Sequence, residues 1–407
     1  MKLIGLILLI CFCALSFEVF ADWQFGQRIA VSAETEKNTF HHLDGAGRKH
    51  VAVSEDRVAV LWEDDSSGSP QIYLALKNKG ESNFSQALKV SIGEEAYEPA
   101  IARLANGRFV LVWEQDGAIY LKTYSEKISG KPLKLSSGAA LASHSSVATN
   151  DGQIYVSWRE QQGKLWSLRV ARLSSKENQD GDLLSINSVE AEGLNTPILF
   201  PSLASNKQGL YVAWEDRSAG HTRLKFSFSV DQAASFSEPS YLNEFFSNRT
   251  EYDKGSGVTR VSIASFGEDE IVSAWMDKRR GGKGYGIFSS IGSDGSFGPN
   301  EKIHGLYGDT LPHYNPSTSG NSNGVAVVAW DDYRMGDSDI WLAGLDDEGE
   351  WGENFSPAQA SGTGEQSHAS VSLDESGGLH LIWLERENPL APTRLWYSYG
   401  EPGVSNE

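Results

Sequence analysis

Val58-Ala59-Val60-Leu61-Trp62 is an apolar strand sequence that ends in tryptophan, and the chain contains six further copies of this pattern. Successive tryptophans of the pattern are 45 to 61 positions apart. A repeat of this length without helical periodicity is typical of the blades of a β-propeller and not of a β-sandwich. The other copies are Phe109 to Trp113, Ile154 to Trp158, Leu210 to Trp214, Ile271 to Trp275, Ala326 to Trp330 and Leu379 to Trp383.

Each repeat divides into four strands, and the second strand carries the tryptophan. The last repeat ends after its third strand, whereas residues 23–32 form an isolated fourth-strand sequence. Placing this segment in the last blade closes the ring and covers a sheet edge that would otherwise be open. We therefore predict an all-β fold, a single seven-bladed β-propeller of four-stranded antiparallel blades closed by the N-terminal strand. Residues 174–195 are interpreted as a long solvated loop.

The N-terminal residues have the features of a secretory signal peptide. Lys2 is followed by an apolar run, and Ala21 is a small residue at the expected cleavage point. The run is too short for a membrane-spanning helix, which needs about 20 apolar residues. We predict a signal peptide over 1–21, a propeller over 22–407, and an exported protein, periplasmic or secreted, with no transmembrane anchor after cleavage. An uncleaved anchor is the alternative.

The formal net charge of −19 excludes nucleic acid as the expected partner, because phosphates demand a basic face. It does not exclude acidic polysaccharides, since a local group of arginines can override the global field. Both cysteines precede Ala21, so the mature chain offers no thiol for a disulfide, a nucleophile or a metal site.

Three turn sequences carry a family resemblance. Ser229-Val230-Asp231-Gln232-Ala233-Ala234-Ser235-Phe236 resembles the Asp-box of sialidase-like propellers, also called the BNR repeat, and residues 293–297 and 347–351 resemble shortened versions. The resemblance implies that the Asp caps the turn and that the aromatic residue plugs the blade. The resemblance is specific for the propeller architecture and is weak as an indication of activity. Arg28-Ile29-Ala30 lacks the proline of the family's N-terminal motif, and the family's enzymes have six blades, so no sialidase catalytic residue is carried over.

One residue in each blade directly precedes the first strand, at the mouth of the axial funnel. Imidazoles, a carboxylate and a guanidinium that converge there would suit a polar ligand. Alternatively, such groups satisfy strand-end backbone atoms or ordered water. The three histidines and the glutamate would also suit a zinc-like ion, although we predict no metal site and name no cofactor. In blade order the ring is His50, Glu98, His144, Phe200, Arg260, Asn315 and His368.

Two further features lie near this mouth. The position two residues after each repeat tryptophan is acidic in six of the seven blades, which favours a structural tie between blades over chemistry. Long loops that enter the funnel face carry Tyr252, His313 and Tyr314, and Arg279 and Arg280 depart from the repeat. Titratable and aromatic groups on loops of a rigid scaffold often contact ligands, although surface variation explains them as well.

The hypothesis with most support is a glycan-binding funnel in a polysaccharide-degrading enzyme, a lyase or a glycoside hydrolase. β-Elimination needs a neutralised carboxylate, a base and an acid, and imidazoles titrate in the right range. Hydrolysis needs two carboxylates about 5–10 Å apart, and the ring has one. The catalytic candidates are His50, Glu98, His144, Arg260, Tyr314 and His368, and the substrate-binding candidates are Phe200, Asn315, Tyr252, Arg279, Arg280 and His313.

The expected partner is a poly- or oligosaccharide, and the chain is expected to act as a monomer. The competing hypothesis is a non-catalytic propeller that binds a glycan or another protein in the cell envelope. Nothing in the sequence separates the two, because fold and funnel composition suit both.

Overall fold

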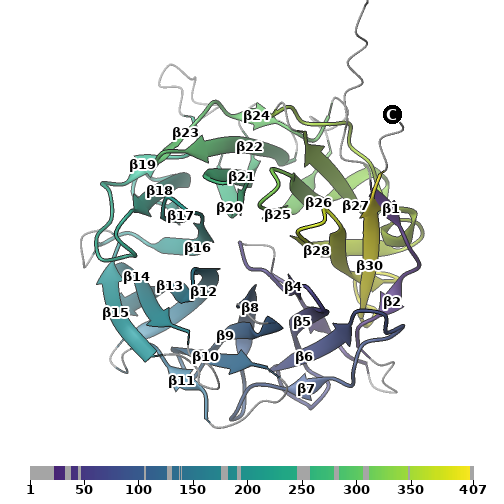
Figure 1. Ribbon diagram of the computed structural model, residues 1–407, viewed down its shortest axis with the longest axis horizontal. Helices are drawn as coiled ribbons and strands as arrows, with labels where there is room; N and C mark the ends of the chain where they lie inside the picture. Colours follow the sequence, from purple (N-terminus) through teal and green to yellow (C-terminus); the bar gives the residue numbers. More distant parts are fainter. Residues whose placement is uncertain are drawn as a thin grey trace, which may run out of the picture.

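The computed structural model describes residues 23–32, 38–44, 47–104, 107–125, 131–136, 138, 140–175, 182–189, 194–244, 257–278, 284–305, 311–346 and 349–403. Seven antiparallel sheets surround a central axis in chain order (Figure 1). This arrangement confirms the predicted seven-bladed β-propeller.

In blades one to six the strands follow one another outward from the axis in the order of the sequence. Blade one contains β3 (His41–His42), β4 (Val51–Ser54), β5 (Arg57–Asp64), β6 (Gln71–Asn78) and β7 (Leu88–Lys89). Blade two contains β8 (Tyr97–Arg103), β9 (Phe109–Gln115), β10 (Ala118–Tyr124) and β11 (Leu133–Lys134). Blade three contains β12 (Leu141–Asn150), β13 (Gln153–Gln162), β14 (Leu165–Ser174) and β15 (Asp182–Ser188). Blade four contains β16 (Ile198–Ser205), β17 (Leu210–Asp216), β18 (Arg223–Ser229) and β19 (Ser240–Tyr241).

The remaining blades vary in their outer strands. Blade five contains β20 (Val258–Phe266), β21 (Glu270–Asp277), β22 (Gly286–Ser293), β23 (Ser296–Phe297) and β24 (Glu301–Lys302). Blade six contains β25 (His313–Gly320), β26 (Ala326–Met335) and β27 (Asp337–Leu345), and single bridges at Trp351 and Phe355 extend its outer edge. Blade seven contains β28 (Glu365–Leu373), β29 (Leu379–Arg386), β30 (Arg394–Pro402), β1 (Trp23–Phe25) and β2 (Ile29–Ala30), after a short turn of 3-10 helix at Ala358–Ala360.

The N-terminal strand closes the ring as the sequence predicts. Trp23 pairs with Pro402 and Ile29 with Tyr397, so β1 and β2 form the outer edge of a blade whose other strands come from the C-terminus. The Trp23 indole also donates a hydrogen bond of 2.8 Å to the Gly377 carbonyl on the turn between β28 and β29. The first and last strands are thereby joined across the whole length of the chain.

The seven repeat tryptophans form the centre of the core, and each is 0% exposed. In five blades the indole N–H donates to the side chain two residues later, as from Trp62 to Asp64 at 2.6 Å and from Trp330 to Asp332 at 2.9 Å. Burying an indole without a partner for its N–H would cost free energy. In these blades the residue two positions after the tryptophan therefore has a structural role. Its hydrogen-bond partner is the tryptophan of its own strand and not a residue of the neighbouring blade.

The turn at Ser229–Phe236 has the hydrogen bonds expected of a capped turn. Asp231 accepts from the Ser235 backbone at 2.9 Å and from the Ser229 hydroxyl at 2.8 Å. Gln232 and Ala233 adopt positive φ angles of 62° and 65°. Phe236 packs against the hydrophobic core between blades three and four.

The interpretation of residues 174–195 as loop was wrong in part. β15 pairs with β14, with Ile186 opposite Ala171. Leu183, Leu184 and Ile186 are exposed large apolar residues on this outermost strand, so the burial pattern that usually marks a strand is absent there. The expected signal peptide lies outside the described residues. Among the residues that the structure does describe, no helix has the length and apolar character needed to cross a membrane.

Trp23→Ala is expected to lower the free energy of unfolding by about 3–5 kcal/mol, because it removes a large buried side chain from the strand that closes the ring. Urea denaturation followed by tryptophan fluorescence measures this loss. Gln24→Ala, at an exposed neighbouring position in the same strand, is the control and is expected to change stability by less than about 0.5 kcal/mol. Equal effects of the two substitutions would show that ring closure does not depend on Trp23.

Candidate functional site

Six of the seven ring residues share an unusual backbone conformation. Their φ angles lie between 48° and 61°, and in every case the ladder between the first two strands of the blade shifts register at that residue. Each is thus the bulged residue of a β-bulge, and its side chain is redirected by the bulge. These six residues are Glu98, His144, Phe200, Arg260, Asn315 and His368.

The residue types at these bulges carry information because the left-handed region is costly for most side chains. Glycine occupies it without penalty, asparagine is tolerated, and other residues cost on the order of 1–3 kcal/mol. Of the six, Asn315, His144 and His368 are of types that are enriched in this region. Glu98, Phe200 and Arg260 are not, so they stand at positions where glycine would make the backbone more stable.

A carboxylate from the preceding blade holds several of these strained residues. Glu63 accepts the backbone N–H of Glu98 at 3.0 Å, and Glu215 accepts that of Arg260 at 2.8 Å. Asp331 accepts the N–H of His368 at 2.8 Å, and Glu114 accepts the N–H of His144. These four acids directly follow repeat tryptophans, a position that the sequence analysis did not use although it is acidic in blades one, two, four and six.

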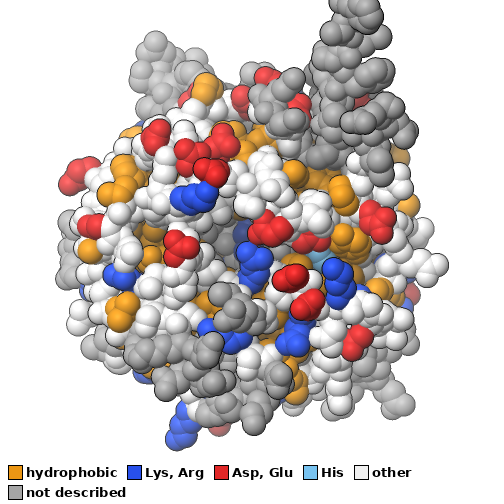
Figure 2. Space-filling model, viewed as in Figure 1, with side chains coloured by type: hydrophobic (Ala, Val, Ile, Leu, Met, Phe, Trp, Pro, Cys, Tyr) orange, Lys and Arg blue, Asp and Glu red, His pale blue; other side chains and the backbone are white. Residues whose placement is uncertain are grey.

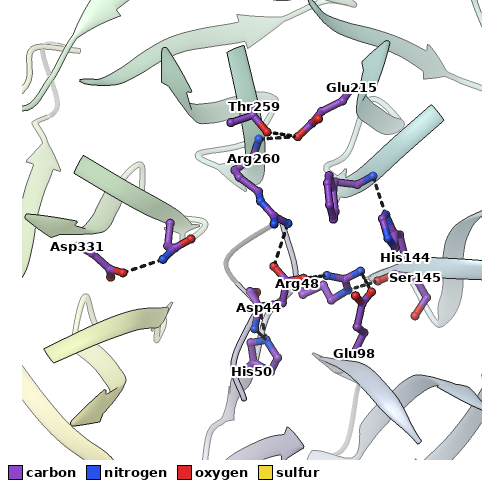
Figure 3. A network of polar contacts seen from close by, with 12 residues as sticks. Asp44, Arg48, His50, Glu98, His144, Ser145, Glu215, Thr259, Arg260 and Asp331 are labelled. Atoms are coloured by element: carbon purple, nitrogen blue, oxygen red, sulfur yellow. Dashed lines mark hydrogen bonds and ion pairs between the residues drawn. The ribbon is translucent and has the colours of Figure 1, made fainter. Parts of the chain in front are cut away.

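Blade one differs from the others because its inner strand is interrupted between β3 and β4. The intervening loop places Arg48, a residue that sequence reasoning missed, in the centre of the polar network (Figure 3). The Arg48 side chain is 1% exposed, and its guanidinium contacts Asp44 at 2.5 Å, the Glu98 carboxylate, and the Ser145 carbonyl at 3.2 Å. Burial alone would lower the pKa of Arg48, but Glu98 and Asp44 raise it.

The same loop crosses the axial channel. Gly47 has a φ of 73°, and a Cβ there would lie 2.5 Å from Ser202 and 2.8 Å from the Val261 carbonyl, in blades four and five. Lys49 continues across the axis and donates hydrogen bonds to Thr318 and Ser262. Only glycine permits this close approach, and no feature of the repeat pattern would have revealed it.

Glu98 and Glu114 form a hydrogen-bonded pair of carboxyl groups beside Arg48. Burial alone would raise the pKa of Glu98, but the charge of Arg48 holds it below the usual value. Burial and then the charge of Glu98 raise the pKa of Glu114 well above its usual value. The two pKa values are therefore shifted in opposite directions, with Glu98 the more acidic carboxyl group of the pair.

His144, Phe200 and Arg260 form a stack on the wall of the funnel. The rings of His144 and Phe200 lie 4.2 Å apart at an interplanar angle of 12°, and the Arg260 guanidinium carbon lies 3.9 Å from the Phe200 ring centroid. Burial lowers the pKa of His144 to about 3, so the ring is neutral. Its Nδ1 accepts the Phe200 N–H at 3.2 Å, which places the proton on Nε2. Nε2 is thus the ring atom of His144 that can donate a hydrogen bond.

Arg260 is the more accessible of the two funnel arginines. Its side chain is 32% exposed, and its ion pair with Asp44 is long, at 3.4 Å. Asp44 therefore lies between both guanidiniums and binds Arg48 more closely. Acidic and basic side chains are interspersed over the molecular face in Figure 2, which agrees with local basic groups on a chain of strongly negative net charge.

His368 differs from His144 in its hydrogen bonding. Burial lowers its pKa to about 4, so this imidazole is also neutral at pH 7. Its Nδ1 has no hydrogen-bond partner among the described residues. Asp331, which holds the His368 backbone, also accepts from the Asn315 amide at 2.7 Å, and burial raises the pKa of Asp331 to about 7.

The other candidates lie in different surroundings. His50 uses Nδ1 toward the Leu61 carbonyl and Nε2 toward the Asp44 backbone N–H, at 3.1 and 3.0 Å, so it anchors the blade-one loop. His313 is 0% exposed and lies 3.0 Å from Asp332. Tyr314 packs edge-on against Tyr285 and Tyr333.

Three of the predicted substrate-binding residues, Tyr252, Arg279 and Arg280, lie outside the described residues. Within the described ranges, no group of three or more His, Asp or Glu side chains could hold a metal ion. The alternative metal-ligand set is not such a group, because its side chains do not converge on one point. This set consists of His50, Glu98, His144 and His368.

Comparisons with known proteins support the fold. No family model and no curated protein sequence matches the chain. A polysaccharide lyase of known structure superposes with a TM-score of 0.58 at 9% identity, covering 93% of this chain and 99% of the lyase. A protein of unknown function from Dyadobacter fermentans gives 0.54 at 11% identity, covering 94% and 99%. An α-L-arabinofuranosidase from Fusarium graminearum gives 0.51 at 12% identity, covering 92% and 97%.

Arg260→Gly is expected to leave the protein about 1 kcal/mol more stable than Arg260→Ala, because only glycine relieves the left-handed backbone without penalty. Urea denaturation of the two variants measures the difference. The same pair of substitutions at Ser205, in an ordinary strand position, is the control and is expected to favour alanine. An alanine variant of position 260 as stable as the glycine variant would contradict strain at this bulge.

His50→Gln is expected to reduce the amount by which the free energy of unfolding falls in acid. The folded pKa of His50, lowered by burial to about 4, lies below the unfolded value, so its contribution is complete above about pH 6.5 and is lost as pH falls toward 4. Glutamine keeps a donor and an acceptor without titrating. The drop in unfolding free energy between pH 7 and 4 is expected to be smaller in the variant, by on the order of 3 kcal/mol. Identical pH slopes would contradict the assignment.

Proposed function

We propose that the axial funnel binds an acidic glycan and that Arg260 receives the glycan's carboxylate. The observation that carries the proposal is Arg260, a residue of a type that is costly at its left-handed backbone position, whose guanidinium stacks on Phe200 and is partly exposed. Arg260 is held in place by Phe200 behind it and by the Glu215 contact to its backbone, yet about a third of its side chain is exposed. A preorganised guanidinium with a weak internal partner is well suited to a carboxylate ligand.

The glycan is the proposed ligand because the structural neighbours named above include a polysaccharide lyase and an arabinofuranosidase. At identities of 9% and 12% they support the scaffold and do not transfer residues. The capped turn at Ser229–Phe236 further supports a relationship to sialidase-like propellers, and the N-terminal sequence supports an exported protein. Both remain proposals.

The chemistry that the funnel supports best is β-elimination from a uronic acid. In this reaction a base takes the C5 proton, the electrons form the C4–C5 double bond, and the glycosidic oxygen leaves C4 with a proton from an acid. His368 is the base in this scheme, because its imidazole is neutral and the residue is partly exposed. Its Nδ1 is buried, so the scheme places the ring proton on Nδ1 and uses Nε2 to take the C5 proton. Tyr314 is the candidate acid. His144, whose Nε2 carries the proton, donates a hydrogen bond to the substrate.

Hydrolysis is the second candidate, favoured by one observation that sequence analysis missed. Glu98 and Glu114 lie side by side, and their pKa values are shifted in opposite directions, that of Glu98 lowered beside Arg48 and that of Glu114 raised by burial. Glycosidases use such a division of roles, although their two carboxyl groups are usually about 5–10 Å apart. A binding module without catalysis would use the same arginine and the same aromatic wall.

The test is incubation of the purified protein with uronate polysaccharides, followed by absorbance of unsaturated ends and by reducing-end assay. Elimination is expected to give both signals, whereas hydrolysis would give reducing ends alone. Arg260→Met is expected to weaken binding of the acidic glycan at least about tenfold, from loss of a charge-assisted contact. Equal binding by wild type and Arg260→Met would exclude the funnel arginine as the carboxylate site.

Asp44→Asn is the matched variant with the opposite expected effect. Asp44 is the internal carboxylate beside Arg260, so removing its charge is expected to tighten binding of uronate oligosaccharides by about tenfold. Calorimetry at low and moderate salt measures this gain, and neutral oligosaccharides are the control. Weaker binding of the acidic ligand by Asp44→Asn would mean that Asp44 supports the ligand instead of competing with it.

A further inference from the structure

We propose that a cleft between blades seven and one is a second binding site, and that it takes neutral oligosaccharide segments. The cleft has a volume of about 1010 Å³ and is lined by β30, by the segment from Gln24 to Ile29, and by turns of blade one. Most of its lining residues belong to blades seven and one, which are adjacent in Figure 1. The turns that line it, Ser54–Arg57 and Asp374–Ser376, follow the inner strands, so it opens on the face opposite the funnel.

A chain of hydrogen bonds forms the blade-seven wall of this cleft. His380 contacts the Tyr397 hydroxyl through Nδ1 at 2.8 Å and Asp374 through Nε2 at 3.4 Å. Tyr399 contacts the same Asp374 oxygen at 3.4 Å. His380 and Tyr397 are almost fully buried, whereas Tyr399 is half-buried. The Tyr399 ring is therefore the part of this hydrogen-bonded group that a ligand can reach.

This polar chain departs from the repeat. His380 stands three residues before its repeat tryptophan, and the equivalent positions in the other blades carry no imidazole and no charge. They are Ala59, Val110, Tyr155, Tyr211, Val272 and Val327. A histidine at an otherwise apolar core position costs desolvation unless it is paired. His380 belongs to a blade that borders this cleft and itself lines it, which associates the polar chain with the cleft.

The local backbone is shaped to admit Tyr399. Gly378 lies so close that a Cβ there would be 2.2 Å from the Tyr399 hydroxyl and 2.6 Å from Asp374. Gly26 donates its backbone N–H to the Tyr399 carbonyl at 2.9 Å, which holds β30 against the N-terminal segment. The tyrosine is therefore fixed from both sides before any ligand arrives.

The chemistry of the walls indicates a neutral, amphipathic ligand. Phe25, Ile29 and Val53 supply apolar surface, and Tyr399 supplies an aromatic ring. Sugars present apolar ring faces for such surfaces and hydroxyls for carboxylates and amides. The charged lining residues are nearly balanced in sign, so no ligand of a single strong charge is favoured. The basic ones are Arg57, Lys77, Lys79 and Arg103, and the acidic ones are Glu55, Asp56, Asp374, Glu375 and Glu401.

The experiment is titration of the full-length protein with short neutral arabino-, xylo- and manno-oligosaccharides, followed by calorimetry and by hydrogen exchange of β30 and the blade-one turns. Wild type is expected to bind at least one of these probes and to show protection at the cleft. Tyr399→Ala is expected to weaken that binding about tenfold, and Tyr399→Phe less, because the ring survives. Gln27→Trp, at an exposed lining position, is expected to block the cleft without touching the polar chain.

Arg260→Met is the control, because it lies in the funnel and is expected to leave neutral binding unchanged. Neutral binding that is lost in Arg260→Met but kept in Gln27→Trp would overturn the second site and assign the ligand to the funnel. Absence of binding to every probe by wild type would also overturn it. The inference does not depend on the proposed function, since failure of uronate binding and failure of neutral binding are separate results.

Discussion

The contact between a carboxylate of one blade and the backbone N–H of a left-handed residue in the next blade is the interaction on which the funnel depends. It satisfies a buried donor that the β-bulge removes from the ladder. It also ties adjacent blades together at the axis, as Glu63 does for Glu98 and Glu215 for Arg260. The side chains that line the funnel take their direction from this bulge, so the structural contact and the candidate site are one arrangement.

The blade-one loop breaks the symmetry of that arrangement. In the other blades the bulge residue is part of a continuous inner strand, whereas in blade one the strand is interrupted and Arg48 enters the centre. The buried guanidinium lowers the pKa of Glu98 against the effect of burial, adds to burial in lowering the pKa of His144, and pairs with Asp44, which also contacts Arg260. One loop therefore sets the charge state of the funnel, and its acid, Asp44, competes with any acidic ligand for Arg260.

Ring closure has a consequence on the opposite face. The seam between blades seven and one is built from both ends of the chain, so it does not repeat the contacts of the other blade interfaces. Elsewhere the residue three positions before the repeat tryptophan packs as an apolar or aromatic side chain, but at the seam His380 joins Asp374 and two tyrosines beside a cleft. The two departures from the repeat, the blade-one loop and this seam, mark the two places where ligands are proposed.

The seven-bladed architecture and the closure by residues 23–32 could be predicted from the sequence, because a repeated alternating strand with a buried tryptophan requires neighbours on both sides. The register of the repeats also aligned the bulged residues, which lie within the first few residues of the inner strands and not before them as the sequence predicted. Arg48, Gly47 and Glu114 could not be found in this way. Their roles depend on a loop that crosses the axis to contact blades four and five, and on carboxyl groups that meet only when blades are side by side. The sequence by itself determined the blade number and the repeat position that the ring residues share. The tertiary structure alone decided their protonation and hydrogen bonding, because burial and neighbouring charges from other blades set those properties.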